Sequence, residues 1–192
     1  MSKTFKVVAV SGSLQRPSRT LSLVHAVLDR LGDALPIEFE VIELGEIASQ
    51  IGPVTRRADL PAAAEAQVRA IEGADLVIAA TPVYRASFTG LFKHLFDFVD
   101  HNALIDVPVL LLASGGSPRH ALVIEQSLRP LFSFFQALTL PIGVFASDGE
   151  FSNYQVKDKL LVERIDLAVE RALPWLRHRT LAASAPLQAL AA

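Results

Sequence analysis

Short runs of continuous apolar residues alternate with longer amphipathic stretches along this chain, and that alternation limits its fold more than any other feature. Such runs are typical of strands buried on both faces of a parallel sheet, and the stretches between them have the periodicity of crossover helices. We predict five strands: Lys6–Val10, Phe39–Leu44, Ala74–Ala80, Pro108–Ala113 and Pro141–Ala146. We predict five helices: Ser18–Leu31, Ala62–Glu72, Phe88–Val99, Arg119–Ala137 and Lys157–His178. Right-handed crossovers then give an α/β fold with a doubly wound five-stranded parallel sheet, order 2-1-3-4-5, and helices on both faces.

The composition limits the kinds of site that the chain can build. Its 192 residues contain no cysteine and leave a formal net charge of -2. This length suits one domain, which we assign to residues 1–180, followed by a mobile tail over 181–192. Without cysteine there are no thiolate metal sites or thiol nucleophiles, so redox chemistry needs a cofactor. The charge balance excludes a basic field for nucleic acid or an anionic membrane, and the lack of a signal segment or long apolar run predicts a cytoplasmic protein.

The loop after the first strand is rich in groups that bind anions. In an open sheet of this order, ligands bind beyond the carboxyl ends of strands one, three and four. The segment 11–20 gathers hydroxyls, one glycine and two arginines just before a helix, whose amino end favours negative charge. The alternative is a simple helix cap at Ser18 in a solvated turn. No GxGxxG or GxxxxGK[ST] motif occurs, which leaves a monophosphate as the ligand. The candidate phosphate contacts are Ser13, Ser18, Arg19 and Thr20, and Ser11 and Arg16 are further candidates for binding the cofactor.

The loops after strands three and four complete the same rim. Pro82 stiffens the first of these loops, and Tyr84 offers a flat apolar surface with a polar tip. The other loop contains Gly115 and Gly116, which let the backbone approach a ligand closely. Taken singly, these loops also fit an ordinary turn with a packed tyrosine and a flexible turn. Together, three such loops on one rim favour a site for a planar phosphorylated ligand.

Histidines and aromatic residues carry less functional information. The five histidines lack metal-ligand spacing, so we expect no metal site. Phenylalanines occur on more than one side of the third and fourth predicted helices, and a lone domain rarely exposes so much apolar surface. This predicts a two-fold subunit interface in a homodimer or homotetramer. The residues in question are Phe88, Phe92, Phe96, Phe132 and Phe135.

The ordered motifs resemble those of NADPH-dependent FMN reductases, a flavodoxin-like family. Gly12 and Ser13 with Ser18, then Thr81–Tyr84, then Gly115–Ser117, match its GS-x(4)-S, [TS]P[VIL]Y and GG loops, and the similarity runs from about residue 7 to 146. Members often carry arginine two positions after the loop serine, where this chain has Gln15 followed by Arg16.

The resemblance implies that NADPH, or NADH, passes hydride to FMN while the two rings stack, with no protein nucleophile, acid or base. It implies that Pro82, Val83, Tyr84 and Arg85 edge the isoalloxazine ring, with Ser114, Gly115, Gly116 and Ser117 opposite. A 2′-phosphate would meet Arg16, Arg85 or Arg119. The segments 119–122 and 128–131 resemble the subgroup that supplies reduced flavin to flavin-dependent monooxygenases in sulfonate desulfurisation. This resemblance implies that the partner is such a monooxygenase, which receives the reduced FMN.

The fourth helix carries a further expectation. Pro130 predicts a kink or bulge near residues 126–129. The sulfonate-system reductases often have one extra residue at this place, which implies that Gln126 forces an i→i+5 bulge. Our hypothesis is that this bulge lies beside a subunit interface and makes FMN a dissociable substrate.

Three other functions compete with this reading. An FMN-containing quinone or azo-dye reductase of the same fold would show the same loops. A flavodoxin-type electron-transfer protein would be strongly acidic, which this chain is not. A response-regulator receiver needs acidic residues after strand one and an aspartate after strand three, where this chain has Ser11 and Thr81.

Overall fold

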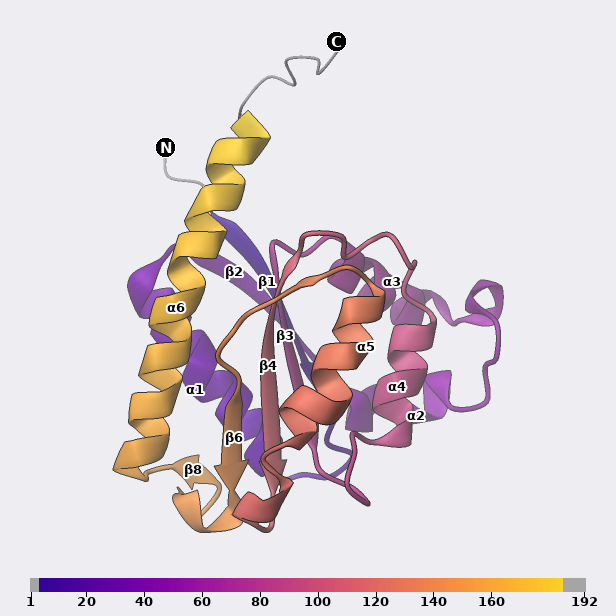
Figure 1. Cartoon of the computed structure of the whole chain (residues 1–192). Helices are drawn as coiled ribbons and strands as arrows, with labels where there is room; N and C mark the ends of the chain where they lie inside the picture. The colour runs from indigo at the N-terminus through magenta and orange to yellow at the C-terminus, as the bar shows by residue number, and fades with distance from the viewer. Residues whose placement is uncertain (1–3, 185–192) are drawn as a thin grey trace.

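A computed structural model describes residues 4–184 and shows a mainly parallel sheet between two layers of helices (Figure 1). Its order is β2-β1-β3-β4-β5, with β6 also paired to β4, so the predicted flavodoxin-like order is confirmed. Valine, isoleucine and leucine make the central strands almost wholly buried, as a sheet covered on both faces requires. The strands of this sheet are β1 Phe5–Ser11, β2 Ile37–Glu43, β3 Leu76–Pro82, β4 Pro108–Gly115, β5 Leu138–Thr139 and β6 Val144–Ser147.

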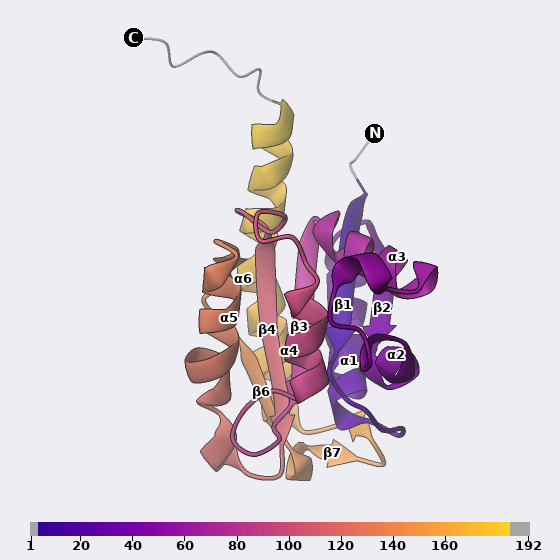
Figure 2. The same ribbon diagram turned by 90° about the vertical axis from the view of Figure 1, so that its right-hand side faces the viewer.

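The helices bury two separate cores, one on each face of the sheet. Helices α1 (Arg19–Ala34) and α6 (Lys159–Ser184) cover one face, where leucines and valines of α1 pack against alternate residues of β1, β3 and β4. The other face is covered by α2 (Leu44–Ile51), α3 (Ala62–Glu72), α4 (Gly90–Asp97) and α5 (Arg129–Phe134). Helix α6 extends past the sheet at the end opposite the strand arrowheads (Figures 1 and 2).

The fifth strand position is divided, contrary to the single predicted strand. Strand β5 pairs with Pro108 and Val109 at the start of β4, whereas β6 pairs with Leu112–Gly115 at its end. The segment between them contains Pro141, which has no amide to donate to a ladder. It also contains Gly143, where an added Cβ would lie 2.7 Å from a methyl group of Ile124. The predicted start of this strand at residue 141 was therefore wrong.

The predicted fourth helix is three shorter pieces. A 3₁₀ turn, η2 (Pro118–His120), leads to a π-helical turn, η3 (Ile124–Leu128), and then to α5. In the π turn the amide of Arg129 donates to the carbonyl of Ile124, an i→i+5 pattern. The bulge that Pro130 and Gln126 predicted is therefore confirmed.

Two other boundaries also differ from prediction. Leu44 begins the unpredicted helix α2, because its side chain and those of Ile47 and Ile51 recur at helical spacing and are buried. Helix α6 continues to Ser184, past the predicted helix end at His178, and residues 185–192 of the predicted tail lie outside the described part. Within the described residues no helix is long and apolar enough to cross a membrane.

The phenylalanines of α4 and α5 mostly fill the core of the chain itself. Phe92, Phe96 and Phe132 are at most 1 % exposed, and Phe135 is 3 % exposed. The rings of Phe96 and Phe132 lie 4.9 Å apart at an interplanar angle of 82°, an edge-to-face contact. The core of the chain itself covers these rings, so their burial does not test the predicted subunit interface. On α5, it is Phe134 that is exposed, at 69 %.

Candidate functional site

A polar pocket of about 240 Å³ lies at the carboxyl ends of the strands. Its walls come from the β1–α1, β3–α4 and β4–η2 loops that the topology indicated, and from a segment after β6. This segment contains the 3₁₀ turn η4 (Asp148–Glu150) and a hairpin of β7 (Phe151–Ser152) and β8 (Gln155–Val156). The pocket is lined by Ser13, Gln15, Pro17, Ser18, Arg19, Thr20, Pro82, Val83, Tyr84, Ser114, Gly115, Gly116, Asp148 and Tyr154.

The start of α1 presents donors to one end of this pocket. Ser18 is the N-cap and its hydroxyl accepts from the amide of Leu21 at 3.2 Å. Within the described residues, the amides of Arg19 and Thr20 have no hydrogen-bond acceptor, as expected for a first helical turn. These amides, the helix dipole and the Arg19 guanidinium together make this end of the pocket suitable for an anion.

Hydrogen bonds fix the three strand-end loops to one another. The hydroxyls of Thr20 and Ser114 lie 2.7 Å apart and are buried. The amide of Val83 donates to the carbonyl of Ser114 at 2.8 Å. A Cβ on Gly12 would lie 3.1 Å from the carbonyl oxygen of Ala80, so only glycine lets the first loop approach β3 so closely. The pocket is thus a preorganised part of the fold.

The segment after β6 closes the pocket beside Arg19. The Nη1 of Arg19 lies 3.5 Å from a carboxylate oxygen of Asp148, and its guanidinium carbon lies 5.1 Å from the ring centre of Tyr154. Asn153 and Tyr154 have φ of 49° and 59°, the primed turn that a two-residue hairpin favours. Asp148 and Tyr154 were missed from sequence, although they follow a strand end of the same sheet.

The β3–α4 loop makes a similar tight turn on the opposite side. Tyr84 and Ser87 exchange backbone hydrogen bonds of 2.9 and 3.2 Å. Between them Arg85 and Ala86 have φ of 50° and 68°, a left-handed conformation that costs a non-glycine residue roughly 1–2 kcal/mol. Such strain concentrates at functional sites. The turn leaves the Tyr84 side chain 44 % exposed at the pocket.

Ten of the fourteen predicted site residues line this pocket, and four do not. Ser11 is buried at 1 % exposure, Arg85 is at the exposed tip of its turn, and Ser117 caps η2 by accepting from the amide of Arg119. Arg16 contacts acidic groups outside the pocket: its Nε donates to Glu43 at 2.9 Å and its Nη2 lies 2.8 Å from Glu46. The hydrogen bond that Arg16 donates to Glu43 raises the pKa of Arg16 above its usual value. Of the two loop arginines, Arg19 is thus the one at the pocket.

The pocket's chemistry fits a flavin mononucleotide. Unpaired amides, hydroxyls and Arg19 suit a phosphate, while Tyr84 and Val83 offer apolar surface to a planar ring. Nothing lies within 4 Å of a Cβ added at Gly116, so the backbone there is open to a ligand. No group of three or more histidine, cysteine, aspartate or glutamate side chains able to hold a metal occurs among residues 4–184.

Comparisons with known proteins agree with this chemistry. The family model for NADPH-dependent FMN reductases matches residues 5–152. The NADH-dependent FMN reductase SfnF of Pseudomonas fluorescens is 59% identical over 174 residues, 91% of this chain and 93% of that protein. An FMN reductase (NADPH) of Pseudomonas aeruginosa is 57% identical, over 94% of this chain and 97% of that protein. The apo crystal structure of the NADH:FMN oxidoreductase EMOB superposes with a TM-score of 0.78 at 29% identity and covers 91% of this chain and 90% of that chain. The chain therefore belongs to the NADPH-dependent FMN reductase family, and it is a flavin reductase that uses FMN and a nicotinamide nucleotide.

Proposed function

We propose that this reductase takes FMN from solution into the pocket at the strand ends, reduces it, and releases it to a flavin-dependent monooxygenase of sulfonate sulfur assimilation. The observation that carries the site assignment is the start of α1, where unpaired amides and Arg19 meet hydroxyls of two loops. Relatives named SfnF and SfnE support the sulfonate context. The absence of cysteine suits a reducing compartment, and we expect the enzyme to act in the cytoplasm.

The phosphate end of the pocket determines flavin binding. Arg19, the amides of Arg19 and Thr20, and the hydroxyls of Ser13, Ser18 and Thr20 surround the position for the phosphate. A charge-assisted hydrogen bond contributes roughly 1.5–3 kcal/mol. Arg19 is 39 % exposed, so solvent screens part of its attraction. A site with these properties favours FMN over riboflavin and still releases it.

The ring end of the pocket orients the reaction. With both rings bound, a reduced nicotinamide passes hydride from its C4 to N5 of the flavin, so the protein needs no nucleophile. Val83 and Tyr84 hold one edge of the flavin ring, and the strained turn at Arg85 fixes the direction of Tyr84. The backbone of Gly115 and Gly116 lies opposite, where amides stabilise negative charge that develops at N1 and O2.

Titration with FMN and riboflavin tests the phosphate assignment. In Ser18→Asp the new carboxylate still caps α1, because aspartate is as good an N-cap as serine, but it repels a phosphate. We expect FMN affinity to fall by several kcal/mol if two charge-assisted bonds are lost, and riboflavin affinity to stay the same. Unchanged FMN affinity in this variant would contradict the assignment.

Steady-state kinetics test the delivery of free flavin. A sequential mechanism with added FMN as second substrate supports the proposal. Flavin that stays bound through purification, with ping-pong turnover of quinones or azo dyes, would instead support a quinone or azo-dye reductase.

We also propose that the chain forms a homodimer or homotetramer through α4 and α5. A cavity of about 610 Å³ opens between these helices, and Leu131, Phe134 and Phe135 line one side of it. Lys93 and Asp97 of α4 lie on the other side and pair with each other. An exposed phenylalanine beside an apolar cavity is typical of a subunit contact.

A further inference from the structure

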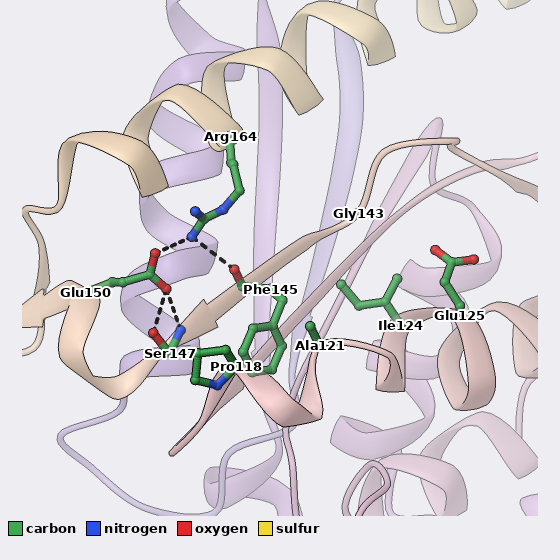
Figure 3. A pocket seen from close by; sticks show the side chains of 9 residues that line it. All are labelled: Pro118, Ala121, Ile124, Glu125, Gly143, Phe145, Ser147, Glu150 and Arg164. Carbon is green, nitrogen blue, oxygen red and sulfur yellow. Dashed lines mark hydrogen bonds and ion pairs between the residues drawn. The ribbon is translucent and has the colours of Figure 1, made fainter.

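Figure 3 shows a second cavity, of about 420 Å³. It lies beside the flavin pocket. The two share a wall at the β4–η2 loop, since Gly116 lines the flavin pocket and Pro118 lines the second cavity. They share another wall at η4, since Asp148 lines the flavin pocket and Ser147 and Glu150 line the second cavity.

Two irregularities in the fold open the cavity. The π turn η3 places Ile124 and Glu125 along one side, and the divided fifth strand places Gly143 and Phe145 along the floor. Gly143 and Ile124 approach so closely that an added Cβ would clash at 2.7 Å. π turns and interrupted strands concentrate at functional sites, because they redirect side chains that a regular element would hide.

The cavity has an apolar part and a polar part. Phe145 and Ile124 form apolar surface, with Phe145 only partly buried. At the other part, Figure 3 shows Arg164 reaching from α6 toward Glu150 and the carbonyl of Phe145, to which its Nη2 donates at 3.3 Å. Glu150 accepts from the amide and the hydroxyl of Ser147 at 2.7 and 2.8 Å and from Arg164. Each member of this polar network is thus held in place, with one face open to the cavity.

We propose that this cavity binds the adenosine end of the nicotinamide dinucleotide, with the base against Phe145 and Ile124 and the ribose beside Glu150 and Arg164. The proposal rests on the proposed flavin site, because the nicotinamide must lie over a flavin in the neighbouring pocket. In Rossmann folds, which bind the same dinucleotides, a carboxylate hydrogen-bonds a ribose hydroxyl of NAD and an arginine accommodates the 2′-phosphate of NADP.

Ala121 allows the cavity to be filled without removing any contact. It lines the cavity and is exposed, so Ala121→Phe places a ring in the space proposed for the base. Ala66→Phe is the matched control, since Ala66 is an exposed alanine of α3 that lines neither this cavity nor the flavin pocket. The hydride donors to compare are NADH and reduced nicotinamide mononucleotide, which lacks the adenosine end.

We expect Ala121→Phe to raise the KM for NADH by about tenfold or more and to leave the KM for reduced nicotinamide mononucleotide and both kcat values unchanged. AMP alone should bind the wild-type protein in calorimetry, compete with NADH, and fail to bind Ala121→Phe. Ala66→Phe should behave as wild type in every assay.

Three results would overturn the proposal. They are an unchanged KM for NADH, an equal rise for both donors, and wild-type protein that does not bind AMP. A changed sedimentation coefficient of Ala121→Phe, together with an equal loss of activity with both hydride donors, would show that a second copy of the chain occupies the cavity. Failure of wild-type protein to oxidise NADH with FMN would instead contradict the flavin assignment, so the two proposals fail separately.

Discussion

Asp148 places a carboxylate in the same pocket as the donors proposed for the phosphate, 3.5 Å from Arg19. It both repels a phosphate and competes with it for the guanidinium. We therefore predict that Asp148→Asn binds FMN more tightly than wild type. Both side chains are more than a third exposed, so the gain should be small, about 0.2–1 kcal/mol. Fluorescence titration with FMN measures it.

Riboflavin is the internal control for Asp148→Asn, because it has no phosphate to repel. Its affinity should not change in the variant. If the affinity for both flavins rises to the same extent, Asp148 acts on the ring or the ribityl chain. That result would contradict the proposal that Asp148 competes with the phosphate for Arg19.

The site could be predicted from sequence where it lies on loops between strongly patterned elements. Ser18, Thr20 and Gly115 were found because each follows a buried strand or begins a helix. Tyr154 was missed because it lies on a short hairpin whose position depends on contacts with α1 that no local pattern encodes. The sequence did not decide between Arg16 and Arg19, because the partners of Arg16 outside the pocket, Glu43 of β2 and Glu46 of α2, are distant in sequence.

At the scale of elements, the buried strands were the most predictable part of the fold. Continuous apolar runs located β1, β3 and β4 within one or two residues at most boundaries. Helix α2 was missed because it begins directly at the end of β2 with no turn residue between them. The divided fifth position depends on the contact of Gly143 with Ile124, which is a tertiary effect.

The 3₁₀ turn η1 (Arg57–Asp59) is held to its neighbours by Arg57. Its guanidinium donates to Glu65 at 3.0 Å, to Glu72 at 2.9 Å and to the carbonyl of Phe98 at 3.2 Å. We predict that Arg57→Gln lowers the free energy of unfolding by about 1–3 kcal/mol near neutral pH, because partly buried acceptors lose their donor. Urea denaturation measures this, and Arg56→Gln is the control, since among residues 4–184 the Arg56 side chain pairs with Asp59 alone and is 77% exposed.

The effect of Arg57→Gln should depend on pH. Hydrogen bonds from Arg57 and then Arg69 hold the pKa of Glu65 below its ordinary 4.5. A carboxyl whose pKa is lower in the folded state stabilises the fold above the unfolded pKa and loses that contribution as pH falls through the folded value. The difference between wild type and Arg57→Gln should therefore shrink below about pH 4.5. A difference that stays constant down to pH 3 would show that Glu65 does not contribute.

The π turn η3 gives a prediction for flavin exchange. Gln126 is exposed within this turn, so its deletion removes one residue without removing a buried side chain. Regular winding would then rotate the preceding residues by about 100° about the helix axis and move Ile124 away from Gly143. We expect the deletion variant to retain FMN through purification and to lose reduction of added FMN. It should still oxidise NADPH with an artificial acceptor at saturating NADPH, with a raised KM because Ile124 also lines the cavity proposed for the adenosine end. A variant that folds, is colourless and turns over free FMN as before would show that the turn has no role in exchange.

At the scale of the whole molecule, the exposed Phe134 distinguishes a lone chain from an assembly. It is 69% exposed beside the cavity between α4 and α5, and its ring lies 5.3 Å from that of Phe135. In a two-fold dimer this patch would meet its own copy, and a phenylalanine there buries enough area to contribute roughly 1.5–3 kcal/mol on each side. We therefore predict that Phe134→Glu dissociates the assembly at micromolar concentration in sedimentation velocity. Phe39→Glu is the matched control, since Phe39 is 53% exposed on β2, away from these helices, and its replacement should leave the assembly intact. Wild-type protein that sediments as a monomer across moderate salt would contradict the proposed assembly, and dissociation by Phe39→Glu alone would move the interface to the β2 edge of the sheet.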